Sequence, residues 1–370
     1  MPKLTFYPLE NADCCLMELA DGQRLLFDFA DMRNPDDDDD LRIDLSAAVR
    51  DDLKAADRTS VNVLGFTHLD RDHINRSSEF FYLRHAKKYQ SDDRIKFDTM
   101  WVPAAVIIEE ACEDEAKIIQ KEARWRLRKG DGIRVFSRPD KLKDWLEAND
   151  LTLEQRAHLI TDAGQLIPGY SKDAEGVEFF VHSPFASRID GGELLDRNTD
   201  SLVMQATFLA GGTETKLILA ADTVHETLTQ IVKVTKYKKR EARLAWDICK
   251  LPHHCSYLSL SDDKGKDETV PVPEVKWLFE QGLRGGIIIS TSKPIPTNDD
   301  DKQPPHRQAA NYYRRRAREI SGEFKVTMEH PSTRRPERLV INIDGSGATV
   351  RKALLAGGYV ATGRPSPRAG

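Results

Sequence analysis

The segment Thr67-His68-Leu69-Asp70-Arg71-Asp72-His73 carries four side chains of the metal-ligand type within six residues. It directly follows Ser60-Val61-Asn62-Val63-Leu64-Gly65-Phe66, a compact apolar run with the residues of a buried strand. The ligand-type side chains are therefore expected on the loop after a strand, where a rigid sheet fixes their directions. Imidazole nitrogen and carboxylate oxygen suit Zn²⁺, Mn²⁺ or Fe²⁺, and the absence of cysteine from the segment disfavours a structural zinc site. The spacing predicts an open metal site.

A second interpretation of this segment is a polar turn that caps a helix beginning near Asn75, because aspartate and asparagine are favoured at helix N-caps. Capping needs only one of the ligand-type side chains. The presence of His68, Asp70, Asp72 and His73 together in this register favours the metal site.

Two later segments place further ligand-type residues directly after predicted strands. A hairpin that turns at Ala210-Gly211-Gly212-Thr213 leads to Asp222, and the run Trp246 to Leu251 leads to the pair His253-His254. Loops that follow separate strands can converge at one edge of a sheet, so these residues are expected to join the 67–73 segment. The alternative for Asp222 is a helix cap before Val224.

In this order the motifs resemble the metallo-β-lactamase superfamily, specifically the branch similar to the soluble β-lactamase-like domain of competence-type DNA-uptake proteins, over most of the chain. The HxHxDH loop of the superfamily stands here as His68-x-Asp70-x-Asp72-His73, with aspartate in place of the second histidine, as that branch also commonly shows. Two positions depart from the branch, because Ala221 and Cys255 stand where the family has glycine. The resemblance implies an α/β fold, an αββα sandwich, and two divalent metal ions, Zn or Mn.

Carried over residue by residue, the resemblance implies one metal bound by His68 and Asp70, and Asp222 as the carboxylate that bridges both metals. The other metal is implied to be bound by Asp72, His73 and one histidine of the pair His253-His254, with the choice between the two left open. The remaining histidine is then available for substrate contact or proton transfer.

Further roles follow from the same resemblance and from the chemistry of a two-metal centre. His182 stands near the position of a third histidine for the first metal, and its alternative is an ordinary core or surface histidine. Asp72 would orient the attacking hydroxide and His254 is the candidate for proton transfer, while Asn198 and Ser201 would donate hydrogen bonds to a substrate oxyanion. His306 is expected to contact substrate, with the start of a helix as its alternative.

The composition limits the class of function. The chain has 370 residues and a net charge of −5, which argues against a protein whose main affinity is for nucleic-acid phosphates. No apolar run approaches ~18 residues and the N-terminal residues lack the pattern of a signal peptide, so a cytoplasmic protein without membrane contact is expected. Five cysteines, an odd number with no CxxC spacing, predict reduced thiols.

One domain is expected over residues 1–355, with a helical insertion at 105–160 and a disordered tail at 356–370. The predicted function is hydrolysis of a phosphodiester, of a nucleic acid or a nucleotide, because the additional aspartate favours harder cations and oxyanion substrates. Two alternatives stay open: a non-catalytic module that docks a protein partner through 105–160, and an ester, amide or lactone hydrolase. The basic stretch Tyr312 to Arg318 could contact nucleic acid, although a solvated helix face is the preferred interpretation.

Overall fold

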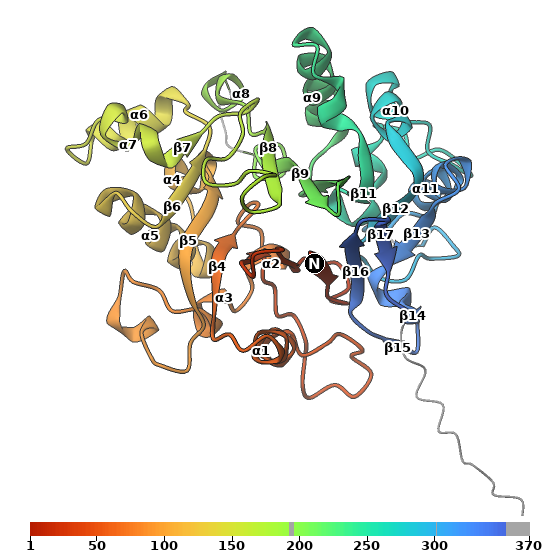
Figure 1. Ribbon diagram of the computed structural model, residues 1–370, viewed down its shortest axis with the longest axis horizontal. Coiled ribbons are helices and arrows are strands. Elements are labelled where there is room, and N and C mark those ends of the chain that lie inside the picture. Colours follow the sequence, from red (N-terminus) through yellow and green to blue (C-terminus); the bar gives the residue numbers. More distant parts are fainter. Residues whose placement is uncertain (192–195, 301, 353–370) are drawn as a thin grey trace, which may run out of the picture.

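The computed structural model describes residues 1–191, 196–300 and 302–352. Figure 1 shows two sheets with helices arranged around their outer sides. The first sheet has the strand order β17-β16-β1-β2-β3-β4-β5-β6-β7, and the second has the order β13-β12-β11-β10-β9-β8. A separate two-stranded ribbon pairs β14 with β15.

The strands have the following bounds: β1 Lys3–Phe6, β2 Cys15–Glu18, β3 Arg24–Phe27, β4 Ser60–Gly65, β5 Lys96–Pro103, β6 Ile133–Phe136, β7 Ile160–Thr161, β8 Val177–Ser183, β9 Val203–Ala210, β10 Thr213–Ala220, β11 Trp246–Lys250, β12 Gly282–Ser290, β13 Glu323–Val326, β14 Pro331–Ser332, β15 Arg335–Pro336, β16 Leu339–Asp344 and β17 Gly347–Val350. The α-helices are α1 Leu45–Ala55, α2 Arg71–Ile74, α3 Ser77–Phe80, α4 Ala104–Ile108, α5 Asp114–Lys129, α6 Asp140–Glu147, α7 Leu153–Arg156, α8 Ala186–Gly191, α9 His225–Tyr237, α10 Pro273–Glu280 and α11 Arg307–Glu319.

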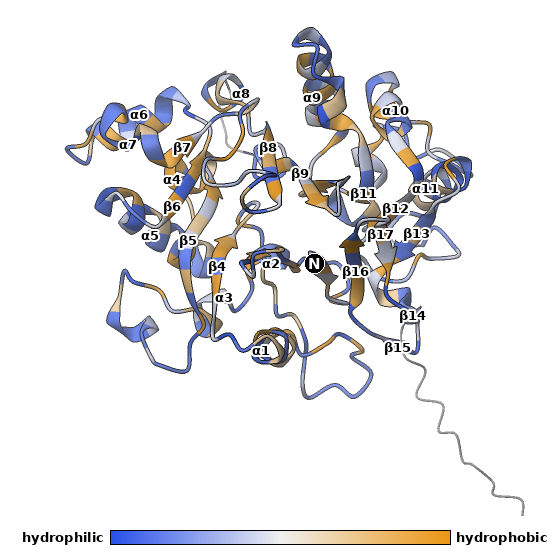
Figure 2. Cartoon of the chain, in the orientation of Figure 1, coloured by the Kyte–Doolittle hydropathy of each residue, from blue (hydrophilic) through white to orange (hydrophobic). Residues whose placement is uncertain are grey.

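Three hydrophobic cores define four layers. The central core joins side chains of the first sheet, such as Phe27 and Trp101, to side chains of the second, such as Phe179 and Phe208. A second core lies between the first sheet and helices α1, α4, α5 and α6, and a third lies between the second sheet and α9, α10 and α11. In Figure 2 the hydrophobic colour gathers on the strands, and the hydrophilic colour on the outer helices and loops. The expected αββα sandwich is therefore confirmed.

Local sequence signals explain several elements that hold the site. The β9–β10 hairpin turns at Gly211 and Gly212, which both adopt positive φ and so suit a residue without a Cβ. The two strands pair in antiparallel register over their whole length, and β10 and β11 then run parallel. As a result, the chain leaves β10 and β11 at the same edge of the second sheet.

The stretch 105–160 differs from the predicted helical insertion. It contains α5, α6, α7 and most of α4, but also β6, which pairs in parallel with β5 inside the first sheet. Its helices contribute Ile107, Ile119 and Leu142 to the core on the outer face of that sheet. These helices are thus part of the outer helical layer, while β6 belongs to the first sheet. The strand escaped prediction because its four residues are too few to interrupt the helical pattern on either side.

Three other predictions concern the chain as a whole. The predicted disordered tail at 356–370 lies outside the described residues. Within the described ranges, no helix combines the length and the apolar character that crossing a membrane requires. All five cysteines are buried and free, as reduced thiols require.

Candidate metal centre

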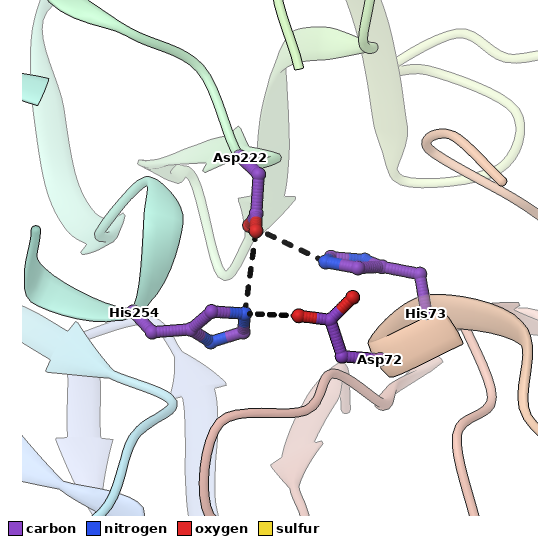
Figure 3. A group of neighbouring side chains, drawn as sticks. All are labelled: Asp72, His73, Asp222 and His254. Carbon is purple, nitrogen blue, oxygen red and sulfur yellow. Dashed lines mark ion pairs between the residues drawn. The ribbon is translucent and has the colours of Figure 1, made fainter. Parts of the chain in front are cut away.

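Four side chains from three loops converge between the two sheets (Figure 3). Asp72 and His73 lie in α2 after β4, Asp222 follows β10, and His254 follows β11. Asp222 places Oδ1 3.3 Å from His73 Nε2 and Oδ2 3.3 Å from His254 Nε2, and Asp72 Oδ2 lies 3.3 Å from His254 Nε2. One ligand atom from each residue lies within 4.8 Å of the other three. Such a set of two imidazoles and two carboxylates is suited to a divalent cation.

The 67–73 segment is directed into the centre by close packing at the end of β4. A Cβ at Gly65 would lie 2.7 Å from the Phe27 ring, so glycine lets the strand end approach β3. The helix begins at Arg71, and Asp70 at its N-cap makes no capping hydrogen bond with its side chain. Asp222 is not a cap either, because the N-cap of α9 is Val224. The helix that begins nearest Asn75 is α3, whose N-cap Arg76 also makes no side-chain capping hydrogen bond, so neither capping interpretation is supported.

The loop after β11 has an unusual backbone. His253, His254 and Cys255 all adopt left-handed conformations, with φ of 48°, 49° and 66°. Such φ values cost non-glycine residues energy and are concentrated at functional sites. The φ of Cys255 is one that suits glycine, whereas Ala221 is not among the positive-φ residues of the described chain. His254 Nδ1 donates a 2.7 Å hydrogen bond to the Thr291 carbonyl, which leaves Nε2 directed at Asp222.

Asp28 and Thr67 fix the orientation of His73. The His73 Nδ1–H donates to Asp28 Oδ2 at 2.8 Å, and Thr67 donates to the same carboxylate through both its amide and its hydroxyl at 2.8 Å. The carboxylate thereby holds the tautomer that leaves His73 Nε2 free for a cation. Behind it, the buried Lys250 ammonium contacts Asp13, whose Oδ2 lies 3.8 Å from His73 Nδ1.

The electrostatics of the cluster call for a cation. Burial lowers the pKa of both His73 and His254, but the surrounding carboxylates, Asp222 foremost, together outweigh burial and raise both pKa values, that of His254 to about 10. Burial raises the pKa of Asp222, yet the two imidazoles hold it well below its usual range. His73 Nε2, His254 Nε2 and Asp222 Oδ1 are buried without a hydrogen-bond partner. Buried polar atoms without partners are costly, so the cluster fits a metal ion that would coordinate them.

His68 and Asp70 lie beside this group but outside it. His68 Nε2 is 3.6 Å from Asp70 Oδ2, and the Arg197 guanidinium donates to Asp70 Oδ1 at 3.0 Å. Burial raises the pKa of Asp70, but its interactions with His68 and Arg197 prevail and lower it to about 2. Asp70 is therefore ionised and already paired.

The centre opens on a pocket of about 370 Å³. His254 belongs to the four-residue group, while His253 lines this pocket together with Asp72. Burial lowers the pKa of His253, which keeps its imidazole neutral at pH 7. The rim of the pocket carries the cationic side chains of Arg42 and Lys293 and the carboxylate of Glu10.

The other predicted site residues are held elsewhere by their own partners. His182 donates from Nε2 to the Arg243 carbonyl at 2.9 Å and packs on Phe180. With its Nε2 used in this way, His182 does not serve as the third histidine of the first metal. The buried Ser201 hydroxyl donates to the Asn198 carbonyl at 2.6 Å, which leaves no proton for an oxyanion.

Both ring nitrogens of His306 have partners, because Nε2 donates to the Lys302 carbonyl at 3.2 Å. His306 Nδ1 accepts from the Tyr257 amide at 3.4 Å, and His306 is also the N-cap residue of α11, as its alternative interpretation expected. Asn198 Oδ1 is buried without a hydrogen-bond partner.

The basic helix α11 does not present an aromatic surface for bases. Tyr312 and Tyr313 are buried in the third core against Phe279, and Arg315 and Arg316 both pair with Glu319. The tyrosines of α11 thus pack inward and its arginines lie on the outer side in ion pairs. This agrees with the solvated helix face that was the preferred interpretation of the sequence.

Sequence reasoning missed Asp13, Asp28, Lys250 and Arg197. The first two flank short N-terminal strands, where a single aspartate is an ordinary turn residue. Lys250 falls within the predicted strand Trp246 to Leu251, and a lysine in a buried strand is itself a signal of a buried carboxylate partner.

The layers and the centre define an αββα sandwich with a histidine–aspartate cluster suited to a divalent metal, between the two sheets. No family model matches the chain, and no curated protein matches it. The chain is similar to the solved structure of unliganded yeast PDE1, with a TM-score of 0.42 and 10% identity over 88% of this chain and 97% of that one. It is also similar to a long form RNase Z from yeast, with a TM-score of 0.36 and 11% identity over 88% of this chain and 40% of that one.

Proposed function

We propose that the protein is a metal-dependent hydrolase that cleaves a phosphodiester of a nucleic acid or a nucleotide. The observation that carries the proposal is the convergence of Asp72, His73, Asp222 and His254 from three loops, with three buried ligand atoms that lack hydrogen-bond partners. A divalent ion bound there, Mn²⁺ or Zn²⁺, supplies an acidified water and polarises a substrate oxygen.

The residues of the chain then divide the remaining tasks. The Asp72 side chain is 32% exposed, against 5% or less for its three partners, so Asp72 is the carboxylate that reaches the pocket and can orient the attacking water. His253 stands at the pocket wall with a neutral imidazole, which suits proton transfer to the leaving group. His254 Nε2 lies 3.3 Å from a carboxylate oxygen of both Asp72 and Asp222, so a ligand role for His254 beside them fits better than proton transfer.

The surroundings of the pocket favour an anionic substrate. Lys293 is exposed at its rim, and Arg42 stands beside it, held to Asp40 by a 2.6 Å ion pair. Because the whole chain carries a net charge of −5, recognition of a polyanion has to be local, and these cations stand at the entrance to the centre. Asn198 and His306 stay proposed substrate contacts.

The number of metal ions is a separate matter. The group of four can hold one ion without further ligands. A second ion, as the resemblance implies, would have to be held by His68 and Asp70 together with an oxygen of Asp222.

The decisive experiment is turnover of bis-p-nitrophenyl phosphate by protein stripped with EDTA and reloaded with Mn²⁺ or Zn²⁺. The stripped protein is expected to be inactive, the reloaded protein active, and Asp222→Asn inactive in both states with its fold retained. His225→Ala is the matched control, because His225 forms a separate histidine–carboxylate group with Glu226 and Asp262. Metal-loaded protein that turns over esters or lactones but no phosphodiester would establish the alternative hydrolase. Metal-loaded protein without any turnover would establish a binding module.

A further inference from the structure

Asp70 lies between the imidazole of His68 and the guanidinium of Arg197. Its Oδ2 lies 3.6 Å from His68 Nε2, and its Oδ1 accepts from Arg197 Nη1 at 3.0 Å. In the loop motif this is the position at which a second histidine would be a metal ligand. Here the ligand-type side chain is already bound to a guanidinium.

Arg197 is fixed in this orientation by three acceptors from distant segments. Its Nη1 also donates to the Leu69 carbonyl at 2.9 Å, and its Nε donates to the two oxygens of Glu109 at 3.0 and 3.1 Å. Glu109 directly follows α4, and Arg197 lies before β9. Burial lowers the pKa of Arg197, but the hydrogen bonds to Glu109 and Asp70 outweigh it and raise the pKa, so the charge is permanent.

His68 and Asp70 form the half-site at which a second metal ion would bind, and within the described chain this half-site has too few further ligands. Among the described residues, His68 and Asp70 belong to none of the groups in which three or more ligand atoms of histidine, cysteine, aspartate or glutamate lie within 4.8 Å of one another. His182, the candidate third histidine, donates instead to the Arg243 carbonyl. A divalent ion here would share the Asp70 carboxylate with a fixed guanidinium, and two like charges on one carboxylate repel each other.

We infer that Arg197 takes the place of the second metal ion, and that the chain holds a single divalent ion at Asp72, His73, Asp222 and His254. The inference rests on the proposed metal centre and narrows it. Arg197 donates hydrogen bonds to Leu69, Asp70 and Glu109. It therefore acts as a positioning residue that holds the 67–73 loop in place and excludes a metal ion from the half-site of His68 and Asp70.

The test is the number of Mn²⁺ ions bound per chain, measured by isothermal titration calorimetry on full-length protein stripped with EDTA. Wild type and Arg197→Lys, which keeps the charge, are expected to bind one ion. Arg197→Met is expected to bind two, and to return to one when Asp70→Asn is added. Arg188→Met is the matched control, because Arg188 pairs with Asp200 and its side chain is 34% exposed, against 27% for Arg197. This control is expected to bind one ion.

Any other result would overturn either this inference or the proposed metal centre on which it rests. Two ions on wild type, with the second lost in Asp70→Asn, would show a two-metal centre. One ion on a folded Arg197→Met would show that Arg197 is not what excludes the second ion. If Arg197→Met does not fold, the wild-type count decides, with Asp70→Asn expected to keep the single ion at unchanged affinity. No ion on wild type would refute the proposed function itself, which is a different outcome from two ions.

Discussion

Asp28→Asn is the substitution that best separates the support of the metal centre from the centre itself. Asp28 is 3% exposed and accepts three hydrogen bonds of 2.8 Å, two from Thr67 and one from His73 Nδ1. Its φ of 57° is left-handed, a conformation that asparagine tolerates as well as aspartate does. The change therefore keeps the shape and the backbone but removes the charge and one of the two acceptor oxygens.

The expected effects are of two kinds. An asparagine keeps one acceptor oxygen for three donors and turns an amide N–H toward His73 or Thr67. Loss of about one hydrogen bond to a charged group lowers the free energy of unfolding of the metal-free protein by about 1.5–3 kcal/mol. Loss of the carboxylate behind a ligating histidine weakens metal binding by about 10- to 100-fold. The second effect corresponds to about 1.4–2.7 kcal/mol.

The assay is Mn²⁺ affinity by competition with a chromophoric chelator, combined with urea unfolding of the metal-free protein. Asp31→Asn is the control, because Asp31 is also buried in this region and accepts from the Ser46 hydroxyl at 2.8 Å. That control is expected to keep full metal affinity. If Asp28→Asn binds Mn²⁺ within about twofold of wild type while its stability falls, the carboxylate does not set the tautomer of His73 and the reasoning is refuted.

Three further predictions concern charge and stability. Lys250→Met alone leaves the Asp13 carboxylate buried without its partner and is expected to cost about 3–5 kcal/mol in urea unfolding, whereas adding Asp13→Asn recovers most of the loss; an additive double variant would contradict this pairing. Burial lowers the pKa of His182 to about 4, so the unfolded chain takes up a proton that the folded chain does not as the pH falls from about 6.5 to 4. Stability due to neutral His182 is thus lost on acidification by at most about 1.4 kcal/mol per pH unit, and His182→Gln should lessen that slope and leave the Mn²⁺ content unchanged; an equal slope in both proteins would contradict it. Mn²⁺ at about 100 times its Kd should stabilise the stripped protein by about 2.7 kcal/mol, seen as a raised Tm, and an unchanged Tm in Asp222→Asn is the control.

The parts of the fold that sequence predicted well are those with strong local signals. The β9–β10 hairpin has two strands rich in apolar and β-branched residues on either side of Gly211 and Gly212, and the strand at Ser60–Gly65 is a short run that ends at a polar loop. Each signal is contained within about ten residues. The loop that follows each of these strands could therefore be placed at a sheet edge without knowing the rest of the chain.

The supporting residues could not be predicted because their partners are far apart in the chain. Asp13 and Lys250 are separated by 237 positions, and Arg197 and Asp70 by 127. A lone aspartate or arginine at the end of a strand looks like any turn residue until its partner is known. His182 shows the opposite case. Its position in the sequence is close to that of the expected metal ligand, but its Nε2 is directed at the Arg243 carbonyl.

The charges at the centre explain how so many carboxylates can be buried together. Among the described residues, the carboxylates of Asp13, Asp28, Asp72 and Asp222 lie around the two imidazoles and the Lys250 ammonium contacts Asp13, which leaves three negative charges when both imidazoles are neutral. Two protons on His73 and His254 reduce this excess to one, and the raised pKa values of both imidazoles indicate that they carry these protons in the metal-free chain. A divalent ion bound to neutral imidazoles also reduces the excess to one. Folding and metal binding therefore meet the same electrostatic requirement by exchanging two protons for one divalent cation, which makes metal affinity rise with pH.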